Sequence, residues 1–553
     1  MIVVGSGFGG SVAAYRFAKA GKSVFVLERG KEYPPGSFPR SPRELAMNFW
    51  DPSEGLQGLF QTWSFRGIEA VVAAGLGGGS LIYANVLIRK DERWFVHEDR
   101  YEGGYENWPI GRSDLDPHYD EVERMLGAQV FPFASPGYDI PKTRALRDAA
   151  QARGLDWELP NLAVTFANPN ATPKRAAPIP VGDYPNYHRA SRETCRLCGE
   201  CDIGCNFGAK NTLDHTYLSA AKAEGAEIRP LSEVRRLFPR DGGGFEVGYV
   251  RHEPARGDGR PTETSKLPLI TVTGDRVVMA AGALGSPYLL LRNRDAFGGL
   301  RPALGTRFSG NGDLLTFVMG AGNILDGSYG PVITSRVRVP DTVDGGDGRG
   351  HYVQDAGFPD FLNWVIETTQ APSTAVRVVR FVARRIWARL TRDPRSELGA
   401  ELSDVMGRAE LSSRSLPLLG MGRDVPDGVM DLRGPQNKYL DIKWTTRTSR
   451  DYFHQVQRTM EALADAMGGT LRNNPLWRLR RVVTVHPLGG CPMGRHRNEG
   501  VVDEWGESFD VPGLHVVDGS VMPGAVGPNP SLTVAAFADR MADHVLEGGT
   551  REG

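Results

Sequence analysis

His486 is the side chain of this sequence whose surroundings best suit it to take a proton from a substrate. The segment from His486 to Gly494 reads HPLGGCPMG, and its prolines and paired glycines can turn the chain sharply and present the imidazole to a cavity. An imidazole changes charge near neutral pH and is therefore a common general base. A histidine that stands alone in such a turn is more often structural, so a catalytic role needs support from other residues of the C-terminal region.

Two further polar side chains lie within the same C-terminal region. Asp518 ends the apolar stretch VVD, which is typical of a buried strand. Asn529 lies 43 residues after His486 in a turn rich in glycine and proline, and residues 531–543 then read as a helix. The region therefore carries an imidazole, a carboxylate and an amide in turns that adjoin regular elements.

Four of the five cysteines lie in one short run. Cys195, Cys198, Cys201 and Cys205 have the C-x2-C-x2-C-x3-C spacing of bacterial ferredoxin loops, whose thiolates bind an iron-sulfur cluster. This sequence differs from ferredoxins in two ways. No proline follows the run, and only one run is present, whereas the fourth cysteine of a ferredoxin run commonly binds a second cluster. The same thiolates suit a structural zinc ion, and reduced thiols or a disulfide pair are the other interpretations. A cluster here would give electrons an exit from a reduced cofactor.

A glycine turn near the start of the sequence has the pattern of a dinucleotide site. The segment Gly5-Ser-Gly7-Phe8-Gly9-Gly10 follows an apolar strand and opens a helix, so a pyrophosphate can rest on the helix N-terminal amides. Glu28 ends the next strand, where a carboxylate can accept hydrogen bonds from ribose hydroxyls. A second glycine cluster, from Gly75 to Ser80, offers more amides for phosphate or flavin. The turn alone does not distinguish FAD from NAD, and a turn without a ligand is the other interpretation.

The elements expected around these motifs form two domains. Helices are expected at residues 8–20 and 286–292, and short buried strands are expected at residues 1–5, 23–27, 276–281 and 513–518. This alternation predicts one α/β dinucleotide-binding domain made of three separate pieces: residues 1–89, 190–299 and 478–553. The intervening residues, 90–189 and 300–477, lack the alternation and are richer in proline, aspartate and scattered aromatics, which predicts a second domain.

Taken together, the motifs resemble those of the glucose-methanol-choline (GMC) family of FAD-dependent oxidoreductases. The N-terminal glycine turn, the GGGS loop about seventy residues later, and the C-terminal HPxGGxxMG, VVDxSxxP and NPSLTVAAFADR segments match that family in order and spacing. Asn529 stands where many members have a second histidine, and this choice favours the cholesterol-oxidase branch. The resemblance implies a discontinuous Rossmann-type FAD-binding domain and an α+β substrate-binding domain built on an antiparallel sheet.

The resemblance also implies roles for particular residues. His486 would take the hydroxyl proton while hydride passes to flavin N5, and Asn529 would hydrogen-bond the substrate hydroxyl. The residues that would hold FAD are Gly5, Gly7, Phe8, Gly9, Gly10, Glu28, Gly77, Gly79, Ser80, Val234, Ala281, Gly282, Asp518, Gly519, Asn529 and Pro530.

One segment departs from the steroid-isomerising members. Those members use an active-site glutamate in a segment that corresponds to residues 358–364, where this chain has Asn363. The carboxylates nearby are Asp355, Asp360 and Glu367. We therefore expect no isomerase step.

The expected activity is oxidation of a bulky, hydrophobic, sterol-like alcohol to a ketone or aldehyde, with oxygen or an external carrier as the electron acceptor. One alternative is a flavin dehydrogenase of a sugar or aryl alcohol that passes electrons through an iron-sulfur cluster. A nicotinamide-dependent reductase would need neither the GGGS loop nor the HPLGG segment. A non-catalytic electron-transfer subunit is the alternative from another class.

Charge and hydropathy exclude some partners. The 65 Lys plus Arg and 66 Asp plus Glu give a net charge of -1, which provides no field for gathering nucleic acid. No stretch approaches the roughly 20 apolar residues of a membrane span, and the sequence opens on a strand without a signal sequence, so a cytoplasmic protein is expected. Residues 377–392 predict a basic amphipathic helix, which suits either a solvated surface or a peripheral membrane contact.

Overall fold

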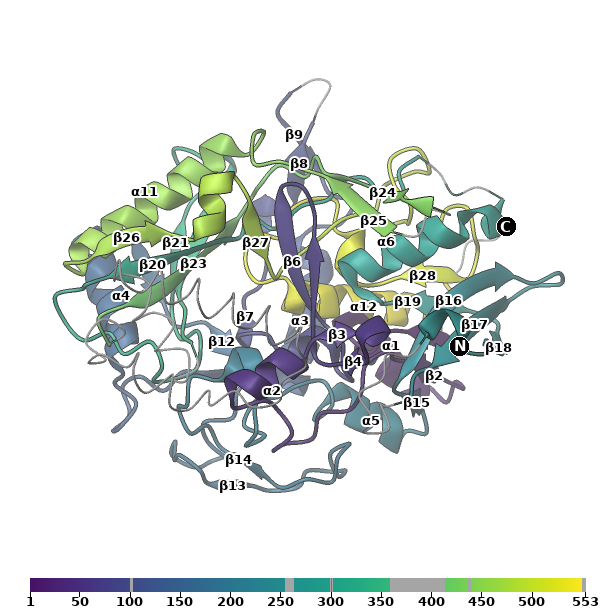
Figure 1. The fold of residues 1–553 in the computed structure, drawn as a ribbon, viewed down its shortest axis with the longest axis horizontal. Coiled ribbons are helices and arrows are strands. Elements are labelled where there is room, and N and C mark those ends of the chain that lie inside the picture. Colours follow the sequence, from purple (N-terminus) through teal and green to yellow (C-terminus); the bar gives the residue numbers. More distant parts are fainter. Residues whose placement is uncertain are drawn as a thin grey trace, which may run out of the picture.

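The computed structural model describes residues 1–99, 103–253, 263–298, 300, 302–358, 413–435 and 439–549. This part of the chain forms two lobes, one around a parallel sheet on the right of Figure 1 and one around an antiparallel sheet on the left. Asp360, Asn363, Glu367 and the amphipathic helix predicted at residues 377–392 lie outside the described residues.

The first lobe is built on five parallel strands, which confirms the predicted Rossmann-type arrangement. The order across the sheet is β15 (Glu227–Arg229), β2 (Phe25–Leu27), β1 (Ile2–Val4), β19 (Val277–Met279) and β28 (Leu514–Val516). Strands from the start, middle and end of the chain are therefore neighbours. β1 and β19 are entirely apolar and buried, as expected for strands covered on both faces.

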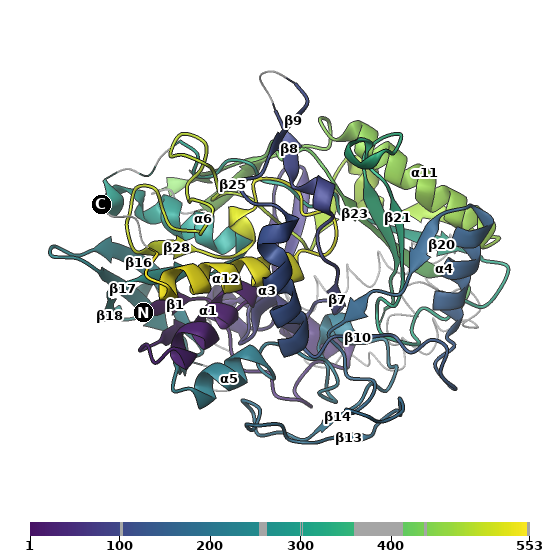
Figure 2. The ribbon, with the colours of Figure 1, turned by 180° about the vertical axis from the view of Figure 1, so that it is seen from behind.

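Helices lie on and around this sheet. They are α1 (Phe8–Lys19), α3 (Arg112–Met125), α5 (Tyr217–Ala223), α6 (Gly282–Asn293) and α12 (Ser531–Leu546). Figure 2 shows α12 alongside α1 and next to α3, and α1 also packs against α5.

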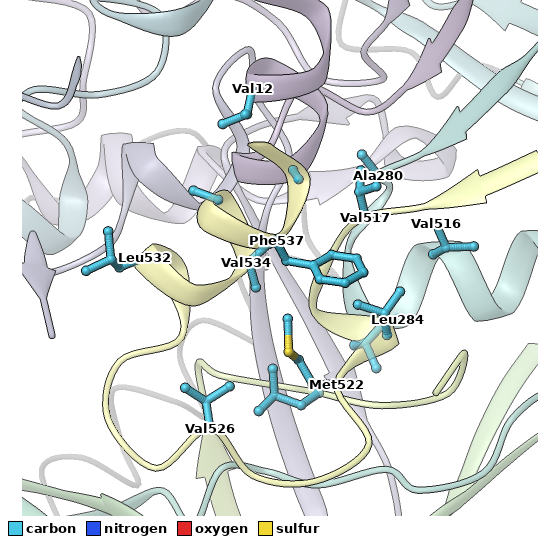
Figure 3. Close-up of a cluster of buried hydrophobic side chains, with 14 of the residues drawn as sticks. Val12, Ala280, Leu284, Val516, Val517, Met522, Val526, Leu532, Val534 and Phe537 are labelled. Carbon is cyan, nitrogen blue, oxygen red and sulfur yellow. The ribbon is translucent and has the colours of Figure 1, made fainter. Parts of the chain in front are cut away.

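A buried apolar cluster fixes the position of α12. Figure 3 shows Phe537 and Val534 of α12 close to Leu284 of α6, Met522 and Val516. Phe537 is fully buried, and burial of a side chain of this size stabilises the fold by about 1.5–3 kcal/mol. The cluster thereby holds α12 beside α6 and β28.

The second lobe contains a six-stranded sheet in which every neighbouring pair is antiparallel, and this confirms the antiparallel sheet expected for the second domain. Its order is β11 (Asp156–Glu158), β21 (Arg336–Val339), β22 (His351–Asp355), β23 (Leu416–Gly422), β20 (Leu314–Met319) and β26 (Thr470–Asn473). Helices α4 (Pro141–Ala152) and α11 (Arg450–Ala466) pack on it. The residue boundaries given above for the two domains remain a prediction.

One small sheet lies close to the predicted catalytic histidine. It pairs β5 (Phe60–Ser64) with β6 (Ile68–Ala73) and β6 with β27 (Val482–Thr484), which ends two residues before His486.

The described chain also contains further strands and one short α-helix. They are α2 (Pro42–Met47), β3 (Trp50–Asp51), β4 (Leu56–Gln57), β7 (Val86–Leu87), β8 (Val96–Glu98), β9 (Tyr105–Asn107), β10 (Gln129–Val130), β12 (Asn161–Leu162), β13 (Pro178–Ile179), β14 (Arg192–Glu193), β16 (Ser232–Pro239), β17 (Phe245–Arg251), β18 (Ile270–Gly274), β24 (Val429–Arg433) and β25 (Tyr439–Lys443). Within the ranges that the structure describes, every helix is too short or too polar to cross a membrane.

Candidate active site

A cavity of about 1030 Å³ is lined by residues of both lobes. Its wall contains most of the residues predicted for the site, which are Gly5, Gly7, Phe8, Gly9, Glu28, Gly79, Val234, Ala281, Gly282, His486, Asp518, Gly519, Asn529 and Pro530. Three predicted residues, Gly10, Gly77 and Ser80, lie outside the wall. Segments far apart in the sequence therefore meet at one cavity, at the carboxyl ends of the parallel strands, where ligands bind in such sheets.

The N-terminal glycine turn is tightly built. Gly5 has a φ of +98°, and a Cβ there would lie 2.3 Å from the carbonyl oxygen of Ala280. A Cβ on Gly7 would instead meet only one atom, at 4.0 Å, so this residue presents bare backbone to the cavity. Helix α1 begins after Gly7 without a side-chain cap and without an acidic residue in its first turn. Its free amides and positive end of the helix dipole suit an anionic group.

The second glycine loop is tied to the first. The Gly77 amide donates to the Ser6 hydroxyl at 3.0 Å. The Ser80 hydroxyl donates to the Gly77 carbonyl at 2.8 Å and accepts from the Leu213 amide at 3.0 Å. Gly77 and Ser80 thus hold the loop on the side away from the cavity, while Gly79 faces the cavity with open space at its Cβ position.

Glu28 lies where the sequence predicts a ribose-binding carboxylate. One carboxylate oxygen accepts from the Ser6 amide at 3.0 Å and from the Ser6 hydroxyl at 2.6 Å. The other oxygen accepts from the Gly30 amide at 2.8 Å. These bonds fix the carboxylate in the cavity wall, and a carboxylate has lone pairs left for ribose hydroxyls.

Two more uncapped helix N-termini meet at the cavity. Helix α6 begins after Ala281, and α12 begins after Pro530, in neither case with a side-chain cap. Asp518 ties the start of α6 to the residues that follow β28, because its carboxylate accepts from the Gly282 amide at 2.9 Å and from the Ser286 and Ser520 hydroxyls. Burial raises the pKa of Asp518, while these hydrogen bonds oppose the rise. Asp518 therefore shapes the wall as well as lining it.

These features fit a bound dinucleotide. Gly7 and Gly79 leave space where a side chain would otherwise project, and the uncapped α1 terminus offers unpaired amides to a pyrophosphate. Glu28 supplies the acceptor for a ribose, and Val234 lines the cavity together with its neighbours on β16. The residues present therefore fit FAD, the cofactor expected from the sequence.

His486 is oriented by a carboxylate that sequence reasoning missed. Its Nδ1 lies 2.8 Å from an oxygen of Asp313, and both residues line the cavity. The other oxygen of Asp313 accepts from the Thr484 hydroxyl and the Val485 amide, each at 2.9 Å. Because a carboxylate can only accept, we assign the proton of the neutral imidazole to Nδ1, which leaves Nε2 as the basic nitrogen.

Asn529 is oriented in a similar way by Gln354 on β22. The Gln354 amide nitrogen donates to the Asn529 side-chain oxygen at 2.7 Å, and both side chains are buried. With its oxygen engaged, the Asn529 side chain keeps its NH2 group as a donor for a substrate oxygen. Gln354 was not predicted from the sequence either.

The rest of the wall is largely apolar. Among the residues around it are Trp50, Trp63, Phe65, Tyr288, Leu315, Phe317, Ile333, Phe358, Leu419, Leu440 and Val483. Such a surface favours an apolar ligand over a strongly hydrated one.

Asp355, one of the carboxylates near the isomerase-related segment, lies outside the wall. It accepts hydrogen bonds from the Thr334 and Ser335 amides and hydroxyls. These bonds give Asp355 a structural role.

Known proteins resemble this chain in sequence and in fold. Residues 177–306 and 432–538 match models described as GMC oxidoreductase, and residues 3–36 match an NAD(P)-binding Rossmann-like domain. A cholesterol oxidase of Mycobacterium tuberculosis is 30% identical over 98% of this chain and 90% of that protein. A 2-methyl-1,2-propanediol dehydrogenase of Mycolicibacterium austroafricanum is 26% identical over 99% of this chain and 94% of that protein. The crystal structure of pyridoxine 4-oxidase from Mesorbium loti superimposes with a TM-score of 0.57 at 18% identity and covers 98% of both chains.

The fold, the motifs and these relatives define the chain as an oxidoreductase, and it belongs to the GMC oxidoreductase family. Within that family it is similar to the cholesterol oxidases, as its C-terminal motifs indicated. The family and the Rossmann-type domain imply FAD as the cofactor.

Proposed function

We propose that the protein oxidises a bulky, hydrophobic alcohol, with His486 as the base. The observation that carries this proposal is the pairing of His486 with Asp313 in a cavity whose wall is otherwise largely apolar. FAD, when bound, supplies the acceptor for the hydride of the carbinol carbon. A sterol-like alcohol fits the apolar lining and is in keeping with the name of the cholesterol oxidase relative.

The protein's own contribution is to move one proton and hold one oxygen. Nε2 of His486 takes the hydroxyl proton, and Asp313 stabilises the imidazolium that forms. The NH2 group of Asn529 donates to the substrate oxygen and stabilises the negative charge that develops there. The apolar wall excludes water, which strengthens both interactions.

An anaerobic absorbance titration tests the substrate class. Sterols, terpene alcohols, long-chain alcohols, aryl alcohols and sugars are added in turn to the holoenzyme at near-saturating concentrations. The loss of the absorbance band of the oxidised flavin is recorded for each. Sterols or comparably large apolar alcohols should bleach the flavin, and sugars should not. Bleaching by sugars or small aryl alcohols alone would replace this proposal with the alternative dehydrogenase activity, and bleaching by no alcohol would contradict alcohol oxidation altogether.

Replacing Asp313 by asparagine should slow flavin reduction by about 10²-fold or more, because the amide cannot stabilise an imidazolium and can hold the wrong tautomer. The rate constant is measured by anaerobic stopped-flow absorbance. The apparent Kd for the alcohol and the FAD content should change little. Asp313→Glu should recover part of the rate.

Asp295→Asn, at a fully exposed carboxylate, is the matched control and should leave the rate unchanged. A normal reduction rate in Asp313→Asn would show that His486 does not need this partner.

A further inference from the structure

The cysteine run encloses a cavity of its own. Cys195, Cys198, Cys201 and Cys205 all line a small space of about 20 Å³. Cys195 is buried, the other three are half-buried, and all four are unbridged. The run is therefore a cluster of four free thiols around one point, and the alcohol chemistry described above does not use it.

The loop that carries the thiols is rigidly built. The Gly199 amide donates to the Gly330 carbonyl at 2.9 Å, and the Gly330 amide donates back to the Leu197 carbonyl at 3.0 Å. Leu197 has a φ of +62°, which is uncommon for a residue with a side chain, and Gly204 has a φ of +94°. Residues with a positive φ can turn backbone amides toward the inside of a loop, as occurs around iron-sulfur sites. The Leu197 amide indeed donates to the Cys195 sulfur at 3.4 Å.

A buried cation adjoins the thiols. Lys210 also lines the small cavity and is almost fully buried. Its ammonium donates to the carbonyl oxygens of Leu81 at 3.1 Å and Cys201 at 2.7 Å. The acidic groups around its ammonium are Cys201, Cys205, Asp202 and Asp214, so thiolates of the run would contribute to balancing its charge.

The spacing of the sulfurs favours a cluster over a zinc ion. Four thiolates on one zinc ion are each about 2.3 Å from the metal, which brings the sulfurs within roughly 4 Å of one another. In the described part of the chain, no three cysteine sulfurs lie mutually within 4.8 Å. Ligands of an iron-sulfur cluster bind different irons and stand farther apart.

The thiol cavity also lies next to the cofactor cavity. Asp202, between the third and fourth cysteines, lines the large cavity, and so does Tyr83. The Lys210 ammonium lies 4.8 Å from the centre of the Tyr83 ring. The two cavities are therefore separated by little more than this pair of side chains.

We propose that Cys195, Cys198, Cys201 and Cys205 bind an iron-sulfur cluster of the four-iron type, and that this cluster is the electron exit of the enzyme. The second half of this statement rests on the proposed alcohol oxidation. Each oxidised alcohol leaves two electrons on the cofactor. The cluster passes them singly to two equivalents of an external one-electron acceptor, and two protons go to solvent.

The first test is the metal content of the full-length protein purified without oxygen. About four irons and four acid-labile sulfides per chain are expected, together with an electron paramagnetic resonance signal after reduction by dithionite. Cys198→Ser and Cys201→Ser should lose the iron and the signal while keeping FAD. Cys491→Ala, at the buried cysteine outside the run, is the matched control and should keep the iron and the electron paramagnetic resonance signal. One zinc per chain in place of iron, or no metal at all, would overturn the proposal.

The second test examines electron transfer through the cluster separately from alcohol oxidation. In Cys198→Ser, anaerobic bleaching by the alcohol should proceed at the normal rate, whereas steady-state turnover with ferricyanide should fall at least about tenfold. Unchanged ferricyanide turnover would remove the cluster from the electron path. If the iron is present but no alcohol bleaches the wild-type flavin, the proposed alcohol oxidation fails and the metal site stands.

Discussion

Replacing His486 by glutamine should leave a folded, yellow protein whose flavin is reduced by the alcohol about 10²- to 10⁴-fold more slowly. Glutamine can still donate to Asp313 from a similar position, so the cavity wall keeps its shape. It cannot take a proton near neutral pH, and the hydroxyl proton then has no acceptor. Anaerobic stopped-flow absorbance measures the rate, and flavin absorbance per chain measures cofactor retention.

His496→Gln is the matched control for this experiment, because the imidazole of His496 is exposed in the same C-terminal region. It should reduce its flavin at the wild-type rate. If His486→Gln does so too, the base is another residue and the proposed mechanism is wrong. A colourless His486→Gln protein with a lowered melting temperature would point instead to a structural role.

The second large effect is expected at Gly9, at the start of α1. A Cβ at this position would lie 2.0 Å from the carbonyl oxygen of Val517, directly after β28, and a backbone atom cannot shift as a flexible side chain can. Gly9→Ala must therefore push α1 away from the end of β28. We expect a loss of about 3 kcal/mol in the free energy of unfolding, at the upper end for overpacked sites, together with loss of most bound FAD.

Gly182→Ala is the control for Gly9→Ala, since Gly182 is exposed and its Cβ position has no atom within 4 Å. Denaturant unfolding and flavin absorbance per chain measure the two effects. An unchanged unfolding midpoint with full FAD content in Gly9→Ala would contradict the close packing of α1 on the sheet.

Local sequence patterns were sufficient to predict the elements that line the cofactor cavity. The helix expected at residues 8–20 is α1, Phe8–Lys19, and the one expected at residues 531–543 is α12, which continues to Leu546. These elements are specified by a glycine turn, by proline and by continuous apolar runs, all of which act within a few residues. Helix α6 begins at Gly282, four residues before the predicted start, because the glycine that signals a turn is itself the first residue of the helix.

The partners of the catalytic side chains could not be predicted in this way. Asp313 is 173 residues from His486, and Gln354 is 175 residues from Asn529. Neither lies in a recognisable motif, and each comes from the antiparallel sheet or its immediate approach, whereas His486 and Asn529 belong to the C-terminal segment. Only the packing of one sheet against the other lobe brings them together.

The pairing of residues from the two lobes has a consequence for how activity can be lost. Asp313 directly precedes β20, and Gln354 belongs to β22, so one rigid sheet aligns the proton acceptor and the oxygen-binding amide together. A ligand or mutation that wedges the halves of the molecule apart by even about 1 Å would misalign both at the same moment. Oversized inhibitors should therefore abolish proton transfer and binding of the substrate oxygen together, without a stage at which only one of the two is lost.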